Sequence, residues 1–225
     1  MNYKVVARTV LAVWIMCSGE VILKAQSVFP GQDGEQTISA SIEAEAGTLF
    51  TVGYQRSFHV EPLGKNIGVF ASATIPSGDE LFNDLRIKLG GQTFLLPENG
   101  YTISAGIALT GIHSDNDLLS ATGFGLDLIL TAGYYGSAWF TAAEAGMDRT
   151  FIANIRFTDY YREYYYEGAR DGWYDHTAGN LRLGIRGGIR AGRTELALRT
   201  GLQTTLALNN RVLPFYAGLS AGYRL

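Results

Sequence analysis

The sequence predicts an all-β fold: a transmembrane antiparallel up-and-down β-barrel of about ten strands with one long extracellular loop region. Three observations predict it. The 225 residues include 28 Gly and 12% aromatic residues, but only 17% are charged. Apolar and polar residues alternate in short segments, as in strands that have one face in lipid and the other in a polar lumen. After Gln26, no stretch reaches the roughly eighteen apolar residues that a spanning helix needs.

Composition excludes several classes of function. There are 18 Lys and Arg residues against 21 Asp and Glu residues, a net charge of -3, so no basic excess is available to hold nucleic acid. The one cysteine, Cys17, lies in a segment that we expect to be removed, which excludes disulfides and Cys-based zinc sites. The three histidines, His59, His113 and His176, are too scattered to indicate a metal site. We predict no metal and no cofactor.

The N-terminus has the layout of a secretory signal peptide. Lys4 and Arg8 precede an apolar stretch, 10–16, that is too short to span a bilayer. We expect residues 1–25 to be removed on export, which leaves 26–225 as a single barrel domain.

Two alternatives concern this segment. Cleavage after Gly19 would place the small Cys17 three residues before the cut, whereas the favoured cleavage after Ala25 leaves Gln26 first. Acylation of Cys17, as in a lipoprotein, is disfavoured because the bulky residues 14–16 in front of it depart from the small-residue lipobox.

Period-two alternation defines the expected strands. In 181–191, Leu and Ile at odd positions alternate with Arg182, Arg186 and Arg190, and the segment 215–225 alternates equally clearly. The predicted strands are 36–46, 49–59, 65–75, 84–95, 101–110, 122–134, 137–147, 179–191, 194–206 and 213–225. With an even strand number both termini lie in the periplasm, where the connections are short, and the longer connections lie outside.

The longest expected outer connection is 148–178. Within it, 151–157 also alternates and could form an eleventh strand. Because an odd number would separate the termini, we interpret 148–178 as a long extracellular loop, partly helical, although twelve strands remain an alternative.

The composition of the polar faces favours an apolar exterior. The alternative is a soluble barrel that turns its apolar faces inward around a ligand. A solvated exterior would carry more Lys and Glu and fewer glycines. The polar faces instead combine Gly, Ser and Thr with a few charged residues: Arg86, Lys88, Asp127, Glu144, Arg182, Arg186, Arg190, Glu195 and Arg199.

The run 140–174, with Asp159-Tyr160-Tyr161-Arg162 and Asp171-Gly172-Trp173-Tyr174, and the ending 215–225 resemble a family of uncharacterised Bacteroidetes outer-membrane β-barrel proteins. The resemblance spans nearly all of the mature chain. It implies the outer membrane of a Gram-negative bacterium, and it implies no established activity. The ending also resembles the signal read by the barrel-assembly machinery, with Leu225 in place of the usual Phe. We therefore expect that machinery and outer-membrane lipid as partners.

One candidate site is a charged row in the lumen, formed by Arg182, Arg186, Arg190, Glu195 and Arg199. Such a row could attract anions. Alternatively, the arginines pair with carboxylates and close the lumen, which is favoured because about ten strands leave little interior space. The expected carboxylate partners are Glu43, Glu45, Asp127, Glu144 and Glu195.

A second candidate is an extracellular binding loop, because exposed aromatic residues beside arginine and carboxylates form good contact surfaces. They would bind an unknown extracellular ligand or protein. The alternative is that they pack the loop as a cap over the barrel mouth. The residues are Asp159, Tyr160, Tyr161, Arg162, Asp171, Trp173 and Tyr174.

A third candidate is the segment 112–117, where His113, Ser114 and Asp115 are adjacent. A serine nucleophile needs a base within hydrogen-bond reach. The spacing does not match the lipid A deacylase pattern, in which one residue separates His and Ser. We assign no catalytic residue. The favoured function is a non-enzymatic barrel with a largely plugged polar lumen and binding loops, followed by a narrow anion-preferring pore and then by a lipid or ester hydrolase.

Overall fold

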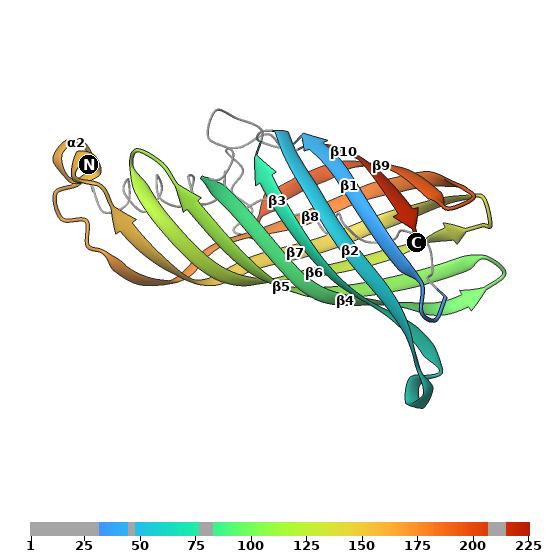
Figure 1. Cartoon of the computed structure of the whole chain (residues 1–225). Helices are drawn as coiled ribbons and strands as arrows, with labels where there is room; N and C mark the ends of the chain where they lie inside the picture. The colour runs from blue at the N-terminus through green and yellow to red at the C-terminus, as the bar shows by residue number, and fades with distance from the viewer. Residues whose placement is uncertain (1–31, 45–47, 77–82, 207–214) are drawn as a thin grey trace.

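Ten antiparallel strands close into one barrel, in which each strand pairs with its neighbours in sequence and β10 pairs back with β1 (Figure 1). The computed structural model describes residues 32–44, 48–76, 83–206 and 215–225. The predicted up-and-down topology is confirmed. The strands are β1 (Gln36–Ala44), β2 (Thr48–Val60), β3 (Lys65–Pro76), β4 (Asp84–Glu98), β5 (Tyr101–Asp115), β6 (Leu119–Tyr135), β7 (Trp139–Phe157), β8 (Gly172–Ala191), β9 (Thr194–Thr205) and β10 (Phe215–Arg224).

The apolar faces of the strands point outward. Leu183 in β8 is 66% exposed, whereas its neighbour Arg182 is 3% exposed, and Leu109 in β5 is 68% exposed beside the buried Thr110. An apolar exterior around a polar interior is the arrangement of a membrane-spanning barrel. The soluble alternative, with apolar faces inward, is therefore wrong. In the described part of the chain, no helix is long and apolar enough to span a membrane.

Short connections gather at one end of the barrel, where β10 also ends (Figure 1). The link between β2 and β3 is a 3-10 turn, Glu61–Leu63, closed by Gly64 in the left-handed region (φ 59°). Asn99 and Gly100 turn β4 into β5, and Gly192 (φ 60°) turns β8 into β9. These positions match the short turns that the sequence predicts.

At the opposite end, β7 and β8 continue well past the barrel, and the expected loop 148–178 is wrong in its bounds. Residues up to Phe157 belong to β7 and those from Gly172 belong to β8, so the connection is 158–171, which contains helix α2 (Asp159–Tyr164). The expected connection 111–121, between the predicted strands 101–110 and 122–134, is likewise largely strand. We call β7 from Phe151, the connection and β8 up to residue 178 the distal hairpin.

A bulge at Phe151 explains the error. The β6–β7 register shifts between Thr150 and Ile152. Thr150 is buried on the inner face, but beyond the bulge the buried residues are the odd-numbered Ala153, Ile155 and Phe157. The alternation in 151–157 therefore continues β7 with its phase inverted, and it is not an eleventh strand.

Inward aromatic rings lie over glycines of neighbouring strands. Tyr216 in β10 crosses Gly184 and Gly201, so that a Cβ atom at Gly184 would lie 2.2 Å from the Tyr216 hydroxyl and 2.5 Å from the Thr200 carbonyl oxygen. The Thr200 carbonyl oxygen belongs to the backbone, which can shift only slightly to make room. These glycines make room for a ring inside a narrow barrel.

We predict that Gly184→Ala destabilises the barrel by about 1–3 kcal/mol, as overpacking does in cores. Gly187→Ala, in the same strand, is the matched control because its Cβ atom would meet nothing closer than 3.4 Å. The measurement is the urea midpoint of the heat-modifiable band of each protein in detergent. Equal midpoints for the two variants would contradict the packing argument.

Candidate functional site

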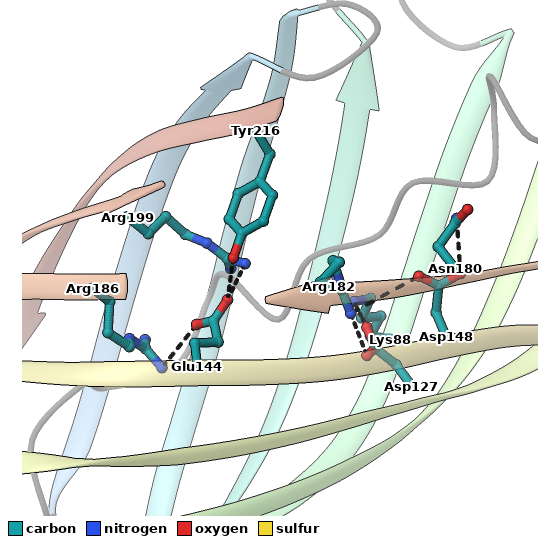
Figure 2. A network of polar contacts seen from close by, with 9 residues as sticks. All are labelled: Lys88, Asp127, Glu144, Asp148, Asn180, Arg182, Arg186, Arg199 and Tyr216. Carbon is teal, nitrogen blue, oxygen red and sulfur yellow. Dashed lines mark hydrogen bonds and ion pairs between the residues drawn. The ribbon is translucent and has the colours of Figure 1, made fainter. Parts of the chain in front are cut away.

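Asp127 is the centre of the first charged network in the lumen (Figure 2). Its carboxylate, fully buried on β6, accepts from Lys88 Nζ of β4 at 2.5 Å and from Arg182 Nη2 of β8 at 2.8 Å. Arg182 also lies 3.9 Å from Asp148, which accepts a hydrogen bond from Asn180 Nδ2 at 3.3 Å. The network joins strands β4, β6, β7 and β8 across the interior.

Glu144 in β7 is the centre of a second network (Figure 2). It accepts from Arg199 Nη2 at 2.5 Å and from the Tyr216 hydroxyl at 3.2 Å, and Arg186 Nη1 lies 3.6 Å away. The Arg199 guanidinium also lies over the Tyr216 ring, 4.9 Å from its centroid. One buried carboxylate therefore lies beside two arginines of the predicted row.

A third network lies towards the short turns. Arg190 Nη2 donates to Glu195 at 2.8 Å, and Arg224 lies 3.8 Å from the same carboxylate and 3.5 Å from Glu35. The structure thus places the whole predicted row in the lumen, with each arginine beside a carboxylate. Glu43 is also buried on the inner face, whereas Glu45 lies outside the described residues.

The lumen also contains apolar clusters that the sequence analysis did not predict. Tyr135 stacks on Phe140 with centroids 5.4 Å apart, and Phe94 meets Tyr135 edge-on at 6.0 Å. A second cluster combines Phe70, Ala108 and Ile129. Side chains of both kinds, charged and aromatic, therefore occupy the interior.

The tip of the distal hairpin has a small core of its own. Phe157 stacks on Tyr161 of α2 at 4.8 Å, and Tyr174 meets Phe157 edge-on at 6.3 Å. Leu119 and Ile155 complete the buried cluster. Burial raises the pKa of the Tyr161 hydroxyl. Tyr161 and Tyr174 are thus packing residues, as the cap alternative expects of the loop aromatics.

Helix α2 is fixed to the β5–β6 hairpin at its first turn. Thr158 is its N-cap and accepts from the Tyr161 backbone N–H at 3.2 Å. The same hydroxyl donates to the Asp117 carbonyl oxygen at 2.8 Å. This hydroxyl therefore ties the helix start to the adjacent turn.

Asp171 closes the connection from the other side. It accepts from the Phe157 backbone N–H at 2.9 Å and from Arg162 Nη2 at 2.6 Å, while Arg162 also reaches Asp159 at 3.2 Å. The Phe157 N–H, and then the Arg162 guanidinium, hold the pKa of the Asp171 carboxyl below its usual range. A lowered pKa in the folded tip means that the carboxylate stabilises the tip above the ordinary pKa of about 3.9. That stabilisation is lost as the pH falls through the lowered value.

We predict that Asp171→Asn speeds tryptic cleavage after Arg162 and Arg170 about threefold to tenfold at neutral pH, because the tip opens more often. Asp159→Asn is the matched control, since the Asp159 side chain is fully exposed and its ion pair with Arg162, at 3.2 Å, is longer than that of Asp171, at 2.6 Å. The measurement is the rate of fragment appearance from the folded protein in detergent. Equal rates for the two variants would show that Asp171 does not hold the tip closed.

The remaining predicted loop residues are exposed aromatics. Tyr160 is 51% exposed and Trp173 is 60% exposed, together with Tyr164 and Tyr165 near the end of α2. They sit on the part of the molecule that is farthest from the short turns (Figure 1). The structure therefore divides the predicted loop residues into three groups. Tyr161 and Tyr174 are packing residues, Asp159, Arg162 and Asp171 are ion-paired, and Tyr160 and Trp173 are exposed rings.

His113 and Ser114 do not form a catalytic pair. Both lie in β5, so their side chains point to opposite faces: Ser114 is buried and donates to Asp84 inside the barrel, whereas His113 is exposed, with Nδ1 3.1 Å from the Thr122 hydroxyl. The expectation that they share a loop is wrong, and His113 is not placed to act as a base for Ser114. Within the described residues, no group of three or more His, Cys, Asp or Glu side chains is placed to hold a metal ion.

No family model and no curated protein matches this sequence. Among solved structures, the chain is similar to "KdgM porin" at 8% identity, over 83% of this chain and 98% of that one, with a TM-score of 0.42. It is also similar to the beta domain of the Bordetella autotransporter BrkA at 14% identity, over 84% and 97% of the two chains, with a TM-score of 0.44. Each likeness is confined to the fold.

Proposed function

We propose that the chain is a non-enzymatic barrel in the outer membrane of a Gram-negative bacterium of the Bacteroidetes type. Its lumen is closed by paired side chains, and its distal hairpin binds an extracellular ligand or partner. The observation that carries the proposal is the contrast between the lumen and the distal hairpin. The interior arginines of the predicted row each lie beside a carboxylate, whereas the rings on the distal hairpin are exposed on a tip that has a buried core of its own.

The pairing in the lumen supports a closed barrel. A permeating ion would have to compete with buried pairs such as Lys88–Asp127, whose side chains are 1% and 0% exposed. Breaking one partner from such a pair in a low-dielectric interior is strongly unfavourable. The aromatic cluster around Tyr135 and Phe140 fills a further part of the interior.

The two barrel ends support an orientation. Short turns and a β10 terminus at the same end are typical of the periplasmic side, which places the distal hairpin outside the cell. Tyr101, Tyr134 and Trp139 contact one another near the short turns, at centroid distances of 5.6 and 4.9 Å, as an interfacial girdle would. Outer-membrane lipid and the barrel-assembly machinery are the expected partners. The proposed signal peptide, 1–25, lies outside the described residues.

Conductance across planar bilayers tests the closed lumen. We expect no stable single-channel steps from the purified barrel. Stable anion-selective steps that Arg186→Glu reverses would instead establish the second candidate, a narrow anion-preferring pore. Its supporting observation is that Arg186 Nε, Arg199 Nε and Arg199 Nη1 are buried and donate no hydrogen bond within the described residues.

Proteolysis of intact cells tests the location and the orientation. We expect a heat-modifiable band, and we expect trypsin added outside the cells to cleave the connection 158–171. Protection of this connection in intact cells would contradict the proposed orientation. For the hydrolase alternative, ester turnover that His113→Ala abolishes would contradict the non-enzymatic assignment.

A further inference from the structure

We propose that Tyr160, Tyr164 and Tyr165 form a platform for neutral carbohydrate, and we call these residues the tyrosine patch. This inference rests on the proposed outer-surface binding function and names the chemical class of its ligand. The patch lies at the end of the distal hairpin (Figure 1).

The patch is a continuous aromatic surface. The Tyr160 ring lies 4.8 Å from the Tyr164 ring, at an interplanar angle of 38°, and 6.1 Å from the Tyr165 ring. The three side chains are 51%, 65% and 55% exposed. The rings contact one another instead of enclosing a central space, so the patch is not an aromatic cage for a cation. A pyranose ring offers a flat face of C–H groups that fits such a surface.

The patch is held rigidly from below. Tyr165 stacks on Tyr161 at 5.7 Å with an interplanar angle of 12°, and Tyr161 stacks in turn on the buried Phe157. A stack of rings therefore connects the exposed surface to the core of the tip. Rings that are ordered before binding lose little conformational entropy when a ligand arrives.

The charges around the patch select against acidic ligands. Asp159, Glu163 and Glu167 are exposed beside the rings, whereas the nearby Arg162 is engaged by Asp159 and Asp171. The acidic flank disfavours uronic-acid polymers and nucleic acids, and its carboxylates accept hydrogen bonds from sugar hydroxyl groups. The core of a protein interface is depleted of charged residues, so this mixture favours a hydroxyl-rich ligand over a protein partner.

Tyr101 provides a matched control. It is 66% exposed, close to the 65% of Tyr164, but it lies at the start of β5 near the short turns, outside the distal hairpin. Its removal therefore deletes an exposed tyrosine ring away from the proposed binding surface.

The experiment is affinity electrophoresis of the full barrel in detergent, with dextran, mannan or galactomannan in the gel and with polygalacturonate and alginate as acidic comparisons. We expect at least one neutral polysaccharide to retard the protein. Tyr160→Ala/Tyr164→Ala should weaken this binding by about tenfold or more, and Tyr101→Ala should leave it unchanged. Heat-modifiable migration and unchanged trypsin resistance of the tip confirm that each variant is folded.

Several outcomes would overturn the inference: retardation by acidic polysaccharides alone, retardation by none, or an equal effect of Tyr101→Ala. These outcomes can be distinguished from a failure of the proposed outer-surface binding function. If proteolysis of intact cells reaches 158–171 but no neutral polysaccharide binds, the outer-surface assignment stands and the carbohydrate assignment falls. If intact cells protect 158–171, the outer-surface function itself falls, whatever the gels show.

Discussion

Asp127→Ala is expected to destabilise the barrel by about 3–5 kcal/mol, the usual consequence of leaving buried charges without their partner. Asp127 is 0% exposed and is the carboxylate shared by Lys88, at 2.5 Å, and Arg182, at 2.8 Å. Alanine would leave both cations in the interior without this carboxylate, although Arg182 keeps its more distant ion pair with Asp148, at 3.9 Å. Coulomb repulsion between the cations would add to the cost of their desolvation.

A charge-free variant separates this explanation from simple loss of packing. In Lys88→Met/Asp127→Leu/Asp148→Asn/Arg182→Met the four charges of the network are removed together and the space stays filled, which is often neutral or stabilising in proteins. We expect its urea midpoint to return most of the way to that of the wild-type protein, as read from the heat-modifiable band. A quadruple variant as unstable as Asp127→Ala would contradict the charge argument.

The alternation of residue types was sufficient to predict the barrel, because each membrane-spanning strand has one face towards lipid and the other towards the lumen. Leu183 and Arg182 are neighbours in sequence, and the first faces out while the second is buried. The glycines and the low proportion of charged residues then indicated which face was inside. The ten strands and their order in the closed barrel agree with the prediction.

The distal hairpin was predicted poorly because the apolar–polar alternation changes phase within it. The bulge at Phe151 moves the inward positions from even to odd numbers, so a pattern with one fixed phase appears to stop there. Asp148 was consequently placed in a loop, although it belongs to the first lumen network together with Asn180. The spacing of Asp148 from Glu144, four residues along the same face, was the available signal.

The charged row was predictable, but its partners were only partly so. The arginines of β8 all have even numbers, so the alternation placed them on the inner face. Their carboxylate partners cannot be read from one strand: Arg182 in β8, for example, meets Asp127 in β6, which is not an adjacent strand. Aromatic residues in the lumen were missed because their inward position requires a glycine opposite. Phe140 lies against Gly188 and Phe70 against Gly90, and such pairings depend on the register between strands.

Glu144→Ala is expected to convert the closed barrel into an anion-selective leak. Glu144 is the carboxylate within ion-pair distance of both Arg199, at 2.5 Å, and Arg186, at 3.6 Å, and it also accepts from Tyr216. Glu144→Ala therefore removes one negative charge and three polar contacts from this part of the lumen. The two guanidinium groups then attract counter-ions, and the truncated side chain leaves space for them.

The measurement is the reversal potential in a salt gradient across planar bilayers, with the wild-type protein and Glu144→Ala/Arg186→Ala as comparisons. We expect conductance steps of Glu144→Ala with a reversal potential of anion-selective sign, and a weaker selectivity when Arg186 is also removed. Glu144→Gln keeps the volume and should conduct less than the alanine variant, which separates the effect of space from that of charge. A cation-selective leak from Glu144→Ala would show that other groups control the lumen, and a silent alanine variant that is correctly folded would show that the aromatic cluster of Tyr135 and Phe140 closes the barrel without the ion pairs.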